Sequence, residues 1–129
     1  MVFSTNKEKG NTSLGMAIAY FTSQGYTVSI PLNDTQDYDL VVEKNNALQT
    51  VQVKSSGCKT KNNHFQVALK SCGGTKGTTY KTFKETFVDL LFIFLADSSM
   101  YLIPANEIKN SSTLTITNKY AKYEINLLK

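Results

Sequence analysis

Residues 39–54 read Asp-Leu-Val-Val-Glu-Lys-Asn-Asn-Ala-Leu-Gln-Thr-Val-Gln-Val-Lys. An apolar run from Leu40 to Val42 leads into four polar residues, and a second run from Leu48 to Lys54 ends in apolar and polar residues that alternate. Polar residues between two such runs predict one strand, a turn and a second strand.

Side chains two residues apart on a strand point to the same face of a sheet. Gln52 and Lys54 are two apart. A hairpin would also place Asp39 at the near end of the neighbouring strand. We therefore expect an acid, an amide and an amine to meet at one edge of a sheet.

This arrangement resembles the PD-(D/E)XK nuclease superfamily, in which an Asp at the end of one strand precedes an acid-x-Lys on the next. Asp39 and Lys54 match the Asp and the Lys, and Gln52 stands where an acid is more usual, a known variant of the pattern. The spacing is similar to that of Holliday-junction resolvases and intron-encoded homing endonucleases.

Other segments follow in the order of that superfamily, and the resemblance covers residues 7–108. It implies an α/β fold with a PD-(D/E)XK nuclease-like core, a central mixed sheet flanked by helices in the order αβββαβ. The matching segments are Lys9-Gly10 before a helix, Gly25–Pro31, Tyr38–Val42, Val51–Lys54, Asp89–Ile93 and Tyr101–Ile108.

The resemblance implies an endonuclease, of resolvase or homing type, that hydrolyses DNA phosphodiester bonds with Mg²⁺ or Mn²⁺. Asp39 would bind the ion through a carboxylate oxygen, the hard ligand that Mg²⁺ prefers. Gln52 would offer its carbonyl oxygen, and Lys54 would hold the attacking water or the phosphate and offset negative charge.

An acid on the first helix is missing. In the resolvases a Glu follows the Lys-Gly pair, and Leu14 occupies that position here. Glu8, the only acid in the first thirty residues, is our prediction for a third ligand and catalytic group. The alternative is that Glu8 is a solvated glutamate on the surface, which the same sequence would give. Asp37 and Glu43 are the other choices. A catalytically weak or inactive DNA-binding protein that retains the nuclease fold is therefore the alternative function.

The charge of the chain is unevenly distributed. The net charge is +4, yet eight lysines and no acid lie between Glu43 and Glu85, which gives this segment +8 and the remainder −4. Lysines release condensed counterions from nucleic acid, so the segment favours DNA as partner over a merely solvated surface. Arginine is absent, which favours recognition of DNA shape over base reading. The predicted DNA-binding residues are Lys59, Lys61, Lys76 and Lys81.

Composition limits the remaining possibilities. A chain of 129 residues with 41% hydrophobic residues predicts a single domain over residues 1–129. Without a membrane-length apolar stretch or a signal peptide we expect no membrane partner and a cytoplasmic protein, with Cys58 and Cys72 as free thiols. Cutting two strands needs two sites, so we expect a homo-oligomer, a dimer or tetramer, with residues 114–128 as its interface.

The remaining pattern predicts a helix capped by Asn11, Thr12 or Ser13 and ending near Gln24. A glycine-containing loop is expected around residues 73–77. Helical turns are expected at 83–88 and 105–109, and strands at 26–30, 65–69, 90–95, 101–103, 113–117 and 123–128.

Overall fold

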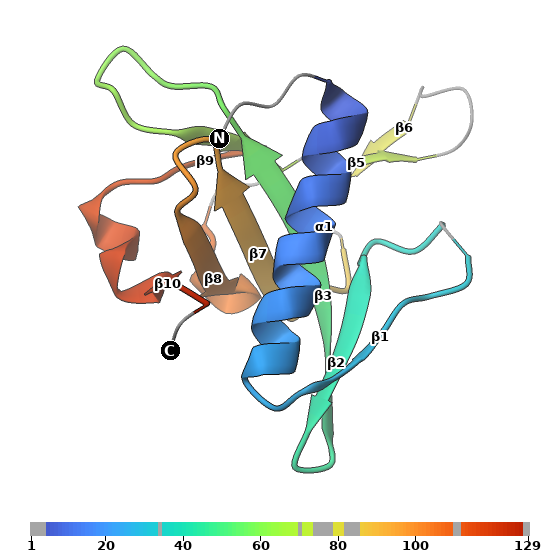
Figure 1. Cartoon of the computed structure of the whole chain (residues 1–129). Coiled ribbons are helices and arrows are strands. Elements are labelled where there is room, and N and C mark those ends of the chain that lie inside the picture. Colours follow the sequence, from blue (N-terminus) through green and yellow to red (C-terminus); the bar gives the residue numbers. More distant parts are fainter. Residues whose placement is uncertain are drawn as a thin grey trace.

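A six-stranded mixed sheet lies between a helix and a two-stranded ribbon in the computed structural model, which describes residues 5–33, 35–69, 71–73, 79–81, 86–109 and 112–127 (Figure 1). The strand order is β1-β2-β3-β7-β8-β10, and β3 and β7 form the parallel pair among antiparallel ones. The predicted α/β fold with a mixed sheet is confirmed. The strands are β1 (Thr27–Ser29), β2 (Leu40–Lys44), β3 (Ala47–Ser56), β7 (Leu90–Leu95), β8 (Met100–Pro104) and β10 (Glu124–Ile125).

Helix α1 (Asn6–Ser23) starts earlier than predicted. Thr5 is its N-cap, and the Thr5 Oγ1 accepts the Glu8 N–H at 3.0 Å. The cap predicted at residues 11–13 is wrong; Ser13 lies inside the helix and donates its hydroxyl to the Lys9 carbonyl at 2.8 Å. Thr5 to Glu8 spells the Thr-x-x-Glu capping box, the signal that marks the true start.

The far end of α1 and its buried stripe follow the prediction. Gly25, with φ of +87°, comes directly after the C-cap, where a residue without a Cβ is favoured. Ala17 and Phe21 are fully buried, and Leu14 and Ile18 pack against the same core. One stripe of α1 therefore fixes the helix on the sheet.

The hairpin predicted within residues 39–54 is confirmed and is longer than expected. β2 and β3 pair from Leu40 opposite Val51 to Lys44 opposite Ala47. The two residues between them, Asn45 and Asn46, have φ of 55° and 66°, the left-handed values that a tight two-residue hairpin turn requires.

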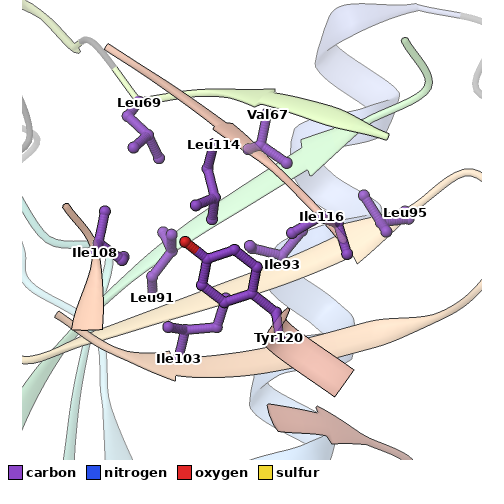
Figure 2. Close-up of a cluster of buried hydrophobic side chains, with 10 residues drawn as sticks. All are labelled: Val67, Leu69, Leu91, Ile93, Leu95, Ile103, Ile108, Leu114, Ile116 and Tyr120. Carbon is purple, nitrogen blue, oxygen red and sulfur yellow. The ribbon is translucent and has the colours of Figure 1, made fainter. Parts of the chain in front are cut away.

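The two faces of the sheet carry different cores. In β7, Leu90, Phe92 and Phe94 pack with α1, whereas the residues between them pack on the opposite face. Figure 2 shows that second core, in which Val67 of β4 and Leu114 of β9 meet the sheet. The ribbon consists of β4 (Gln66–Ala68) and β9 (Thr113–Thr115), paired antiparallel.

This alternation sets the orientation of the predicted site. β3 is in parallel register with β7, with Gln52 beside Leu91 and Lys54 beside Ile93. Val51 and Val53 belong to the helix-side core. Because side chains alternate along a strand, Gln52 and Lys54 lie on the ribbon side of the sheet.

Several connecting segments differ from the prediction. Of the glycine-containing loop predicted around residues 73–77, only Gly73 is described, and it ends β5 (Ser71–Gly73); residues 74–78 lie outside the described part. β5 pairs with β6 (Thr79–Lys81), which the sequence did not predict. Of the turn predicted at 83–88, residues 83–85 also lie outside the described part, and residues 86–88 are not helical. The turn after Pro104 is confirmed as a 3-10 helix, η2 (Ala105–Glu107).

The late segment is part of the core. Leu114, Ile116 and Tyr120 are at most 8% exposed, and η3 (Asn118–Tyr123) occupies residues where the second late strand was expected to begin. Leu114, Ile116 and Tyr120 thus pack inside the chain and are not available for the predicted subunit interface, while the oligomeric state stays a prediction. Within the described residues, no helix is long and apolar enough to span a membrane.

Candidate active site

Asp39 ends the pairing of β2 with β3. Its backbone N–H donates to the Val51 carbonyl at 2.8 Å, and its Oδ2 accepts the Val53 N–H at 2.7 Å. The carboxylate therefore holds the strand that carries Gln52 and Lys54. Because Oδ2 is engaged with the strand, the second oxygen, Oδ1, is the candidate ligand atom.

Lys54 and Asp39 form a pair of opposite charges. Burial lowers the pKa of Lys54, and the Asp39 carboxylate opposes that shift. Burial likewise raises the pKa of Asp39, against the Val53 hydrogen bond and the Lys54 ammonium. The residue Asp39 as a whole is exposed, yet its carboxylate is desolvated by its neighbours. The charged pair is therefore partly shielded from water at a position that a ligand can still reach.

Gln52 is 4% exposed and lies between these two residues along the hairpin. Its Nε2 donates to the Asp37 carbonyl at 3.0 Å. Its Oε1 is buried and has no hydrogen-bond partner among the described residues. Reversing the amide would place two oxygens against each other, so the contact determines which end faces Asp37.

Glu8 lies at the same end of the sheet as the candidate site, but in the helix layer on the opposite face. The first turn of α1 and the carboxyl end of β3 lie at the same end of the molecule (Figure 1). Glu8 is exposed, and α1 packs on the face opposite to Gln52 and Lys54. The helix cap with Thr5 explains an acid at this position, and a role for Glu8 at the site stays a prediction. Glu43 pairs with Leu48, towards the far end of the hairpin.

Two of the predicted DNA-binding lysines lie in the loop that follows β3. Lys59 lies over the Phe65 ring at 4.7 Å from its centroid, and Lys61 is exposed. Lys76 lies outside the described residues. The backbone of Lys81 is in β6, and its side chain belongs to the part left undescribed.

The groups that sequence reasoning missed are backbone groups. The Asp37 carbonyl and the Val53 N–H each bind a site side chain, yet every residue type carries such groups. Only the register of the hairpin and the path of the preceding segment reveal them. No residue pattern in the sequence marks them.

The donor atoms fit a hard divalent cation. The described residues contain no cluster of three His, Cys, Asp or Glu side chains suited to a metal. Mg²⁺, however, is commonly held by one or two carboxylates, with waters and substrate phosphates completing its shell. The Asp39 Oδ1 and the unpartnered Gln52 Oε1 are oxygen donors of that kind.

The fold and this motif define a nuclease class. The family model described as PD-(D/E)XK endonuclease matches residues 4–127, and the chain belongs to that family. Members generally use divalent metal ions and act on DNA. No curated protein sequence matches the chain.

Two solved structures are similar. The bacterial homing endonuclease I-Ssp6803I superposes with a TM-score of 0.76 at 23% identity, over 94% of this chain and 89% of that one. MepB gives a TM-score of 0.47 at 16% identity, over 90% and 97%. The first likeness supports the fold.

Proposed function

We propose that this protein is a Mg²⁺-dependent DNA endonuclease, with Mn²⁺ as a substitute, that hydrolyses phosphodiester bonds. The observation that carries the proposal is the Asp39–Lys54 charge pair where the pairing of β2 with β3 ends, with the Gln52 amide between them along the hairpin. The similar homing endonuclease favours the homing type over the resolvase type.

The chain's residues have separate tasks in this proposal. A bound divalent ion would polarise the scissile phosphate and lower the pKa of a water molecule. Asp39 would hold the ion with its second carboxylate oxygen, while Oδ2 keeps the hairpin in place. Gln52 adds a neutral oxygen, and the half-buried Lys54 ammonium offsets the charge that develops on the phosphate. Partial burial strengthens that interaction, since fewer water dipoles screen it.

The loop after β3 would hold the DNA backbone beside this site. It begins at Gly57, three residues after Lys54. Hydrogen bonds order it: the Ser56 hydroxyl donates to the Gln66 carbonyl, and the Thr60 N–H donates to the His64 carbonyl at 2.8 Å. An ordered loop presents Lys59 and Lys61 at a defined distance from the site, which suits backbone contacts that position DNA.

The alternative is a DNA-binding protein that retains the nuclease fold with little or no activity. Specific observations favour it. The Gln52 NH₂ is already engaged, its oxygen is shielded from water, and the only acid of the N-terminal region, Glu8, is on the layer across the sheet.

Plasmid and branched DNA distinguish the two functions. We expect the parent to nick supercoiled plasmid with Mg²⁺ or Mn²⁺ and not with EDTA. Glu107→Gln, a change at an exposed residue of η2, is the control and should cut like the parent. A parent protein that binds both DNAs and cuts neither with either ion would establish the alternative function.

We also propose a homo-oligomer, because two-strand cleavage calls for two sites. Leu114, Ile116 and Tyr120 of the late segment are buried and do not supply the contact. Ile30 and Leu32 are 58% and 103% exposed and follow the edge strand β1, so they are the better interface.

A further inference from the structure

The segment that leads into β2 is tied to the site by one side chain. Gln52 Nε2 donates to the carbonyl of Asp37 at 3.0 Å, two residues before Asp39. The Asp39 N–H and Oδ2 then bind Val51 and Val53 of the same strand. Residues 37–39 are therefore held against three successive residues of β3.

Two buried side-chain oxygens without partners in the described part of the chain belong to Gln52 itself and to the sequence neighbour of Asp37. Among the described residues, the two buried side-chain oxygens that lack a partner are Gln52 Oε1 and Gln36 Oε1. Gln52 makes the bond to Asp37, and Gln36 is the residue before Asp37. Buried acceptors nearly always have a donor, an ordered water or an ion. The Gln52 oxygen lies on the same amide that binds Asp37, so it indicates a ligand that an oxygen can bind beside the segment.

We propose that Gln52 couples the segment before β2 to cation binding: its NH₂ group fastens the segment through the Asp37 carbonyl, and its oxygen faces the cation. This inference rests on the proposed metal-dependent function. A cation on the amide oxygen draws electron density from the nitrogen, so the N–H···O bond to Asp37 becomes stronger. By linkage, cation binding and order in residues 35–39 then favour each other.

The coupling explains why an amide can replace the usual acid at this position. An ionised Glu at position 52 would still offer an oxygen to a cation, but it would set its other oxygen against the Asp37 carbonyl. Gln52 is thus a positioning residue for the segment as well as a ligand. A structural role alone would not make the segment respond to metal.

Hydrogen exchange of the parent protein tests the coupling without any measurement of cleavage. Exchange of amides in residues 35–39 should slow on addition of Mg²⁺, roughly fivefold if the coupling is worth as much as one net hydrogen bond. Residues of the β2–β3 turn at Asn45 and Asn46 lie at the other end of the hairpin and serve as the internal control.

Gln52→Glu and Gln66→Glu form a matched pair, since Gln66 is exposed on β4. In Gln52→Glu the segment should exchange faster without metal, and Mg²⁺ should no longer slow it. Gln66→Glu should behave like the parent. If Gln52→Glu fails to fold, the effect of Mg²⁺ on exchange of residues 35–39 in the parent protein still tests the coupling.

The outcomes separate this inference from the proposed function. Calorimetry that detects Mg²⁺ binding in the parent and not in Asp39→Asn, together with unchanged exchange in residues 35–39, would overturn the coupling alone. No Mg²⁺ binding in the parent, with or without DNA, would overturn the metal-dependent function itself.

Discussion

The Oδ2 of Asp39 accepts the backbone N–H of Val53 at 2.7 Å, so one carboxylate both ends the hairpin ladder and faces Lys54. The N–H it satisfies lies between the two site residues of β3. Because of this bond, a change at Asp39 alters structure and chemistry together, and variants must be chosen to separate them.

Asp39→Asn and Asp39→Ala separate the two tasks. An Asn oxygen can still accept the Val53 N–H, whereas Ala leaves that donor without its partner, which costs about 1 kcal/mol. We expect both variants to lose metal-dependent nicking and only Asp39→Ala to lose clear unfolding free energy in urea. DNA binding should persist, because removing a negative charge lowers repulsion of phosphate. Nicking by Asp39→Asn at the parental rate would disprove the site.

The charge pair makes stability depend on pH in a defined direction. Burial raises the pKa of Asp39, so its contribution is favourable below the ordinary carboxyl pKa and is lost as pH rises through the folded value. Burial lowers the pKa of Lys54, so its contribution is present above the ordinary amine pKa and lost as pH falls through the folded value. Both groups therefore oppose folding most at neutral pH, where both are charged.

We accordingly expect the neutral double variant Asp39→Asn/Lys54→Met to be more stable than the parent at neutral pH. Its advantage should shrink towards acid pH, where Asp39 of the parent takes up a proton. Unfolding free energies measured across pH at constant salt check this. An advantage that is unchanged between neutral and acid pH would show that Asp39 is not desolvated as described.

Much of this site could be predicted from the sequence because it depends on period-two alternation. The strands around Asp39, Gln52 and Lys54 were predicted correctly, since a single register brings these residues together where the pairing of β2 with β3 ends. The bond from Gln52 to Asp37 could not be predicted, because it depends on the path of an irregular segment. The start of α1 was missed for a different reason: Thr5 and Glu8 carry a capping signal, but Asn11, Thr12 and Ser13 carry competing ones.

Glycine substitutions test the description of α1. A Cβ at Gly15 would have nothing within 4 Å, and Gly15 lies inside the helix. Gly15→Ala should therefore stabilise the protein by about 0.5–1 kcal/mol, because the unfolded chain loses conformational freedom. Gly25→Ala is the matched control; its φ of +87° is unfavourable for Ala, so it should destabilise. Thermal melts of both variants give the answer, and a melting temperature for Gly15→Ala below that of the parent would contradict the helix boundaries.

The basic loop should bind DNA through phosphate contacts. Lys59→Glu and Lys61→Glu should weaken binding to all sequences alike, and neutralising each contact should reduce the salt slope of log K by about 0.9. Lys109→Glu, an equal charge change at an exposed residue after η2, is the control. Binding titrations at several salt concentrations measure both quantities. A parent whose affinity does not change with salt would exclude this role for the loop.

Assembly tests the exposed apolar residues beside β1. Among the described strands, β1 pairs only with β2, and Ile30 and Leu32 follow it at the sheet edge with most of their surface in water. A second copy would cover this surface, and the variant Ile30→Lys/Leu32→Lys should shift the protein from dimer or tetramer to monomer. Leu48→Lys is the control, because Leu48 is 71% exposed near the hairpin turn, away from that edge. Light scattering at tens of micromolar, with and without DNA, measures the mass. A parent that is monomeric under both conditions would rule out the oligomer, and an oligomer that survives the double substitution would place the interface elsewhere.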